Sequence, residues 1–266
     1  MGEMHAFADH SHFGVGLELL YLVPVDGQVA DGVAVKSDVR SGGSDEVTGE
    51  LIAVVEDDYI GRGRGLAALS GPNIAAELAR CLPATAVAAS DDAELARRVQ
   101  SVFSTQWFRV YRNSDVIGTE LAGATKNVIA IAAGILDGLA AGNNAKAALV
   151  TRGLVEITRL GVAMGAQEST FQGLAGLGDL ITTCVSPEGR NRTVGEQIGK
   201  GRKLRDILES TDSVAEGVPT TRSVRELSIR HKVEMPITEA VHSVLFEGTE
   251  VIRALTTLMT RESKPE

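Results

Sequence analysis

The spacing of apolar residues changes near residue 116, and this change limits the folds open to the chain. Between about residues 48 and 115, short apolar segments alternate with segments of helical spacing. The predicted strands are 65–71, 84–90 and 107–114, and the predicted helices are 73–82 and 91–104. Short strands separated by helices of about ten residues or more are typical of an α/β layer.

From about residue 118 onward, nearly every segment has helical spacing. Breaks are expected at residues 142–144, in "FQGLAGLGDL", in "SPEGRNR", at Pro219 and at Pro236. Residues 1–47 show no clear pattern beyond an apolar run, "LELLYLVPV", and a loop-like cluster, "SDVRSGGSDE". The sequence therefore predicts an α/β domain followed by an all-helical one.

Charge and cysteine content exclude several classes of function. The 266 residues include 26 basic and 35 acidic ones, and the net charge of -9 disfavours general binding to nucleic acid or anionic membranes. Cys81 and Cys184 lack the spacing of a metal site, and we expect two reduced thiols. We find no apolar run of about 18 residues and no secretion signal, which predicts a cytoplasmic protein without membrane insertion.

A single lysine interrupts the small and apolar segment "GTELAGATKNVIAIAAGILDG", residues 118–138. On a helical period, Lys126 shares a face with Ala122, Gly123, Ile129 and Ala130. A lysine on such a face either extends its ammonium to water or functions in a pocket.

A strand-to-helix turn, "SGPN", ends the first predicted strand. The first N–H groups of the following helix have no partner within the helix and can bind an anion or a polar ligand. The simpler interpretation is an ordinary turn in which Asn73 caps the helix.

Three glycines, Gly173, Gly176 and Gly178, precede Asp179 in "FQGLAGLGDL". They allow the backbone to approach a neighbouring segment closely. Asp179 is then either the cap of the next helix or a side chain that faces a pocket.

Arg190 and Arg192 flank Asn191 after a turn. A planar guanidinium group suits two-point binding of phosphate, and the amide of Asn191 adds a neutral donor. The alternative is that both arginines are solvated surface residues of an acidic protein.

Taken together, these four places favour an enzyme. A lysine on an apolar face, an aspartate among glycines, an Arg-Asn pair and an open turn form a set that can bind a small phosphorylated polyol and transfer a proton. We predict that Lys126 is the acid/base.

At these residues the sequence resembles a known family. The segments "SGPNIAAELA", "GTELAGATKNVIAIAAGILDG", "TRGLVEITRLGVAMGA", "TFQGLAGLGDLITTC", "GRNRTVGEQIGKG" and "SVAEGVPTTRSV" are similar to bacterial NAD(P)-dependent glycerol-3-phosphate dehydrogenases, in order from about residue 48 to near 255. The resemblance implies an incomplete Rossmann-like dinucleotide-binding domain over 1–116, with 1–47 unmatched, and a helical substrate domain over 117–266. It implies NAD or NADP as cofactor and no metal, and it leaves a homodimer open.

The resemblance also assigns roles to individual residues. It implies that Lys126 is catalytic in the reduction of glycerone phosphate to sn-glycerol 3-phosphate for phospholipid synthesis. The implied substrate-binding residues are Gly71, Asn73, Lys126, Asn127, Asp179, Gly189, Arg190 and Asn191. The implied cofactor-binding residues are Ala75, Arg190, Val214 and Glu216. Gly189 stands where the family usually has serine, so one hydroxyl contact to substrate is missing.

The N-terminal segment departs from the family pattern. Family members begin with a strand and a G-x-G-x-x-G turn that binds the pyrophosphate. Gly14-Val15-Gly16 lacks the third glycine, and the glycines of 61–65 precede a strand instead of following one. The family's second lysine, in a T-K-G turn, is also absent as a motif, and Lys36 is a weak substitute.

This departure leaves three interpretations open. The chain is an enzyme with an aberrant N-terminus, a non-enzymatic remnant without cofactor binding, or a related 2-hydroxyacid or sugar-acid dehydrogenase. The L-G-D-L and G-R-N-R segments disfavour the third, because those relatives lack them. Without the fingerprint, the preference for NAD or NADP is not determined, and the 266-residue chain is expected to bind NADH weakly.

Overall fold

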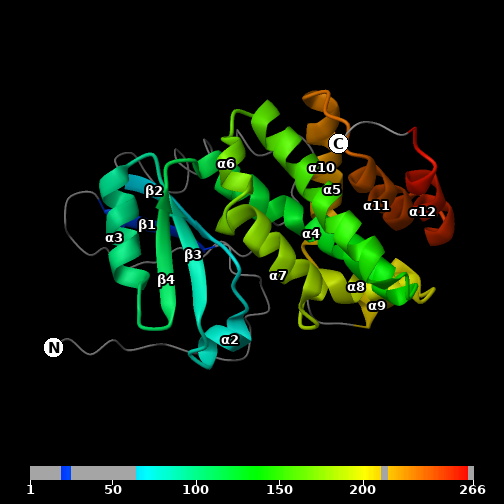
Figure 1. The fold of residues 1–266 in the computed structure, drawn as a ribbon, viewed down its shortest axis with the longest axis horizontal. Coiled ribbons are helices and arrows are strands. Elements are labelled where there is room, and N and C mark those ends of the chain that lie inside the picture. The colour runs from blue at the N-terminus through cyan, green and yellow to red at the C-terminus, as the bar shows by residue number, and fades with distance from the viewer. Residues whose placement is uncertain (1–18, 25–63, 211–214, 263–266) are drawn as a thin grey trace.

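A computed structural model describes residues 19–24, 64–210 and 215–262. The described chain has two parts, a small sheet with its helices and a larger array of helices beside it (Figure 1). This arrangement confirms the predicted class, a partial α/β domain followed by a helical one.

The sheet has four strands in the order β1-β2-β3-β4. They are β1 (Leu19–Pro24), β2 (Arg64–Ser70), β3 (Ala84–Ala89) and β4 (Phe108–Asn113). β2 is antiparallel to both β1 and β3, whereas β3 and β4 are parallel. The three predicted strands are confirmed, and β1 lies in the "LELLYLVPV" run, for which the sequence predicted no element.

Two helices belong to the sheet region, and they differ in capping and packing. The Asp92 side chain caps α3 (Ala93–Phe103) by accepting from Glu94 N at 2.8 Å, and α3 buries Leu95 and Val99 against the sheet. The helix predicted over 73–82 is only the five-residue α2 (Ala75–Ala79). It has no side-chain cap and buries no residue, so neither capping nor packing extends it.

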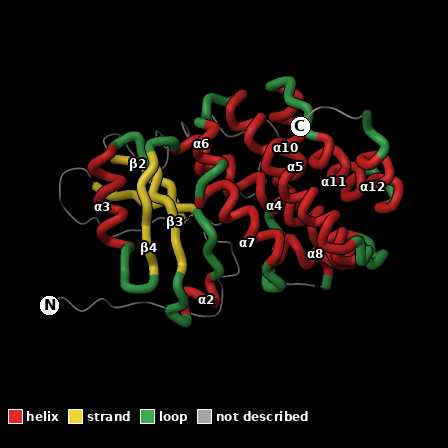
Figure 2. The backbone as a smooth tube through the Cα atoms, in the orientation of Figure 1, coloured by secondary structure: helices red, strands yellow, loops and turns green. Residues whose placement is uncertain are grey.

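The central element of the helical part is α4 (Val116–Gly138), and 16 of its 23 residues are buried. By length and composition alone it is apolar enough to cross a membrane, although Lys126 and acidic residues interrupt its apolar run. In the structure α4 is a core helix surrounded by other helices (Figure 2).

Helices α4 and α8 (Arg190–Gly199) pack with their backbones in contact. A Cβ atom on Gly134 would collide with the Arg192 carbonyl oxygen, and one on Gly195 would collide with the Ile131 carbonyl oxygen. Only glycine permits this approach, which fixes the start of α8 against the middle of α4.

The remaining helices follow the predicted breaks. They are α5 (Gly142–Ala163), α6 (Glu168–Phe171), the π-helical turn η2 (Leu174–Gly178), α7 (Asp179–Val185), α9 (Leu204–Glu209), α10 (Gly217–Arg230), α11 (Pro236–Phe246) and α12 (Val251–Met259). The break expected at Pro219 is misplaced, since α10 begins at Gly217. Proline is tolerated there because first-turn N–H groups have no partner within the helix.

Glu156 is a buried carboxylate that caps another helix. It lies on α5, is 3% exposed, and accepts from Ile237 N at 2.7 Å and Thr238 N at 3.3 Å at the start of α11. Burial raises its pKa to about 7 from an ordinary value of 4.5, although these bonds favour the ionised form. The carboxyl thus holds a proton more tightly in the folded chain than in the unfolded one.

We expect this shift to make stability decrease as pH rises. The contribution of the Glu156 proton to the free energy of unfolding is fully present below pH 4.5 and is lost as the pH rises to about 7. The lost contribution is roughly 3 kcal/mol. Chemical unfolding of Glu156→Gln between pH 4.5 and 8 should show this component of the decline removed. The exposed Glu226→Gln is the control and should keep it. Equal pH profiles for wild type and Glu156→Gln would contradict the assignment.

Candidate active site

Lys126 is paired in the structure. Its Nζ forms an ion pair with Asp179 Oδ2, and the two side chains are 14% and 3% exposed. The partner comes from α7, 53 positions along the chain. Of the two interpretations of this lysine, the structure favours a largely buried ammonium over one that extends to water.

Asp179 follows the π-helical turn η2 and is the first residue of α7. It does not act as the cap of α7, whose N-cap position is Gly178 without a side-chain hydrogen bond. Burial raises the pKa of the Asp179 carboxyl above its ordinary value, and the Lys126 ammonium opposes this shift. The hydroxyl of Thr183 donates to the Asp179 backbone oxygen at 2.7 Å and also lies 3.3 Å from Asp179 Oδ1.

The SGPN turn lies next to this pair. Gly71 has φ 149°, and a Cβ there would be 2.9 Å from Ala86 Cα, so the turn requires glycine. Pro72 is in contact with the segment before Asp179, since a Cβ on Gly178 would be 3.6 Å from its ring. Asn73 does not cap α2, and its amide donates to Gly71 O at 3.2 Å.

Arg190 begins α8 and forms an ion pair with Glu216, which precedes α10. The arginine is 19% and the glutamate 27% exposed, so the pair is mostly buried. Arg192 is also mostly buried and pairs with Asp137 at 2.7 Å. The alternative that both arginines are solvated surface residues is therefore wrong.

Asn191 connects the starts of α8 and α10. Its Oδ1 accepts from Gly217 N at 2.8 Å, and the Asn191 side chain is buried. A Cβ on Gly217 would lie 2.7 Å from Asn127 O, so the start of α10 contacts α4 directly beside Lys126. One turn of α4 thus joins the Lys126–Asp179 pair to the Arg190–Glu216 region.

Several buried polar atoms of this region lack hydrogen-bond partners among the described residues. They include Ser70 Oγ, Asn73 Oδ1 and Arg190 Nη1. A buried polar group without a partner is costly, and such groups are common where a ligand binds. Their chemistry, two oxygens and a guanidinium N–H, fits a ligand with hydroxyl and anionic groups.

The other candidate residues are less informative. Gly189 precedes α8 at its N-cap position, and Ala75 is the exposed first residue of α2. Val214, Lys36 and the glycines 14 and 16 lie outside the described residues.

Two neighbours of Asp179 were not among the predicted site residues. Thr183 follows Asp179 by four positions, a spacing that places both on one face of α7. Ser70 ends an apolar strand directly before Gly71, and a polar residue at that position was its only signal in the sequence.

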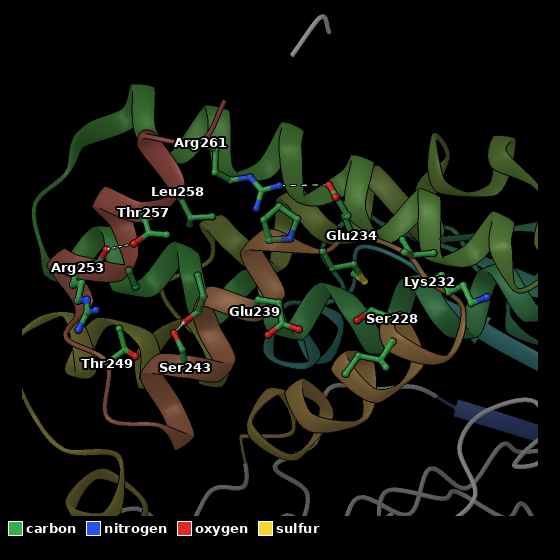
Figure 3. Close-up of a pocket in the computed structure, with 16 residues that line it drawn as sticks. Ser228, Lys232, Glu234, Glu239, Ser243, Thr249, Arg253, Thr257, Leu258 and Arg261 are labelled. Carbon is green, nitrogen blue, oxygen red and sulfur yellow. Dashed lines mark hydrogen bonds and ion pairs between the residues drawn. The ribbon is translucent and has the colours of Figure 1, made fainter. Parts of the chain in front are cut away.

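A pocket of about 660 Å³ lies elsewhere, between α10, α11 and α12 (Figure 3). Its lining includes Ser228, Glu239, Arg253 and an ion pair of 3.5 Å between Arg261 and Glu234. It includes none of the candidate site residues, and its paired charges do not indicate a ligand.

Comparisons with known proteins agree with this geometry. The family model for the NAD-dependent glycerol-3-phosphate dehydrogenase C-terminus matches residues 115–256, and that for the N-terminus matches 39–96. A glycerol-3-phosphate dehydrogenase [NAD(P)+] of Prosthecochloris aestuarii is 49% identical over 251 residues, which is 94% of this chain and 74% of that one. A relative from Geobacter sp. is 57% identical over 203 residues, 76% of this chain and 61% of that one.

A solved structure supports the same relationship. The crystal structure of glycerol-3-phosphate dehydrogenase from Coxiella burnetii is 42% identical, with a TM-score of 0.72, and the match covers 73% of this chain and 60% of that one. The chain thus spans less than two thirds of the length of this structure and of the Geobacter relative. The N-terminal family match begins at residue 39, upstream of the first motif quoted above. The protein belongs to the NAD-dependent glycerol-3-phosphate dehydrogenase family.

Proposed function

We propose that this protein interconverts glycerone phosphate and sn-glycerol 3-phosphate, which provides glycerol phosphate for phospholipid synthesis. The Lys126–Asp179 ion pair, buried where α4 meets α7, is the observation that supports this most directly. A nicotinamide cofactor supplies the hydride when bound. Membership of the family favours this reaction over that of a related 2-hydroxyacid or sugar-acid dehydrogenase.

Lys126 acts as the acid in the direction of reduction. Its Nζ donates a proton to the carbonyl oxygen of glycerone phosphate, while Asp179 orients the ammonium and accepts from a substrate hydroxyl. Asn127 adds a polar group beside Lys126 on α4. Gly71 and Asn73 form the opposite wall of the substrate site, at the turn after β2.

Arg190 and Asn191 bind the phosphate group. Arg190 Nη1 is buried and has no hydrogen-bond partner in the described part of the chain, so it is available for an anion. Gly189 brings the backbone near this group but supplies no hydroxyl. The ion pair with Glu216 holds the guanidinium in place before substrate binds.

Residues around the same arginine would hold the cofactor. Arg190 lies at the start of α8, Glu216 directly before α10 and Ala75 at the start of α2. Val214, the fourth of these residues, lies outside the described residues. In this proposal, residues 1–116 belong to the cofactor domain and 117–266 to the substrate domain of a cytoplasmic enzyme.

Cofactor binding and turnover are measured first on the unmodified chain. None of the 266 residues forms G-x-G-x-x-G, the usual pyrophosphate anchor, so we expect weak NADH binding to this chain and little turnover of glycerone phosphate. Titration of NADH, followed by the fluorescence of Trp107, the only tryptophan, measures the binding.

A chimera that contains the cofactor anchor tests the proposed function itself. Replacing residues 1–63 by the corresponding segment of the Geobacter relative should give micromolar NADH binding and NADH-dependent reduction of glycerone phosphate. A chimera that binds NADH without reducing glycerone phosphate would contradict the proposed function. Micromolar binding by the unmodified chain would contradict only the expectation of weak binding.

A further inference from the structure

We propose that the hydroxyl of Ser70 is a further substrate contact, which donates a hydrogen bond to the substrate hydroxyl held by Asp179. This inference rests on the proposed function and adds a residue that determines specificity for that hydroxyl. Three observations support it, namely the strand face on which Ser70 lies, its buried hydroxyl without a partner, and the acceptor-only chemistry of Asp179.

Strand alternation places Ser70 on the side of the sheet that faces the helical part. Ala67 and Leu69 pack on the face covered by α3, whereas Ala68 packs with Val116 at the start of α4. Ser70 lies two positions after Ala68, so its side chain points to the same face. It is also the last residue of β2, directly before the turn that contacts Gly178.

No well-formed hydrogen bond holds the Ser70 side chain in the described part of the chain. It is 4% exposed, and its Oγ has no hydrogen-bond partner within the described residues. Its hydroxyl does face the Asp179 carboxyl, and this weak interaction opposes the rise of that group's pKa. A carboxylate and a hydroxyl without a well-formed hydrogen bond thus lie close together at the end of β2.

Ser90 provides a comparison within the same sheet. It is equally buried and follows β3, but its Oγ donates to Leu66 O at 2.6 Å and accepts from Asp92 N at 3.2 Å. Ser90 therefore has a structural role that Ser70 lacks. The difference indicates that Ser70 is kept polar for something outside the protein chain itself.

A polyol hydroxyl can form hydrogen bonds with both Asp179 and Ser70. A hydroxyl donates one hydrogen bond and accepts others, whereas an ionised carboxylate only accepts. A substrate hydroxyl that donates to Asp179 still needs a donor, and Lys126 is assigned to the reacting oxygen. Ser70 supplies that donor to the hydroxyl at the end of the substrate opposite the phosphate.

Thermal unfolding of the full chain tests the first part of this inference. Ser70→Ala should unfold at the wild-type temperature or above it, because the change removes a buried polar atom without a partner. Ser90→Ala, the matched control, should unfold at a lower temperature because Leu66 O loses its donor. A decrease for Ser70→Ala as large as that for Ser90→Ala would show that its hydroxyl bonds within the protein and would overturn the inference.

Ligand binding tests the second part, using sn-glycerol 3-phosphate and its analogue propane-1,2-diol 1-phosphate, which lacks the terminal hydroxyl. The shifts in unfolding temperature that each ligand causes give the ratio of the two affinities. Wild type should bind glycerol 3-phosphate more tightly than the analogue, and in Ser70→Ala this ratio should decrease about 3- to 10-fold. Ser90→Ala should retain it. An unchanged preference in Ser70→Ala overturns the Ser70 inference alone, whereas a wild type that neither ligand stabilises overturns the proposed function and this contact with it.

Discussion

Replacing Lys126 by methionine is expected to reduce turnover by roughly two to four orders of magnitude, which is the usual contribution of a positioned acid/base. The methionine side chain is similar in length but donates no proton to the carbonyl oxygen. Because Lys126 is largely buried against α7, methionine fits the same environment, and the fold should persist. The measurement is kcat for glycerone phosphate reduction in the chimera with the Geobacter segment, since that form contains the cofactor anchor.

Lys146→Met is the matched control for this variant. Lys146 is similarly buried, at 20% exposure, and is also paired with an aspartate, Asp137. Its loss should affect stability but leave kcat within a few-fold of the parent. Turnover near the parent level in Lys126→Met, with an unchanged circular dichroism spectrum, would exclude Lys126 from the mechanism.

Removing the guanidinium of Arg190 is the second large change expected. Arg190→Ala should cost roughly 2 to 5 kcal/mol of transition-state binding, because one partner of a desolvated charge pair is lost. This corresponds to a decrease of about 30- to 5,000-fold in kcat/KM for glycerone phosphate. The decrease should be far smaller for dihydroxyacetone, which has no phosphate, and the ratio of the two values is the quantity to measure.

Arg192→Ala separates phosphate binding from structural pairing. Arg192 lies two residues from Arg190 on α8, is 15% exposed, and pairs with Asp137 and Glu196. Its removal should lower the unfolding temperature while the ratio of kcat/KM values stays near that of the parent. Equal losses on both substrates in Arg190→Ala would show that this residue acts elsewhere.

The local elements were largely predictable because their signals are local. Short apolar segments located β2, β3 and β4, helical spacing located α3, and glycine or proline marked most helix ends. The exceptions had weak local signals. β1 lies upstream of the region in which strand and helix segments alternate. α2 lacks the cap and the packing that would have extended it.

The candidate residues could also be identified from the sequence, each by its own local surroundings. Lys126 was conspicuous on its apolar face, and Asp179 among its glycines. Their roles relative to each other were not readable. From local sequence, Asp179 could have been a helix cap and Arg190 a solvated surface residue. The ion pairs of the structure exclude both as the main role.

The sequence by itself determined the order of sheet and helices, the family, and the residues able to carry chemistry. Only the tertiary structure decided which of them meet, because hydrophobic periodicity specifies which face of a helix is buried but not what it packs against. The glycines of α4 and α8 set the start of α8 against the middle of α4, and Gly217 lies between Asn127 and Asn191. Asp179, after η2, meets Lys126 from 53 positions away. The tertiary structure also gives buried Ser90 a hydrogen bond to Leu66, 24 positions away, and gives buried Ser70 none among the described residues.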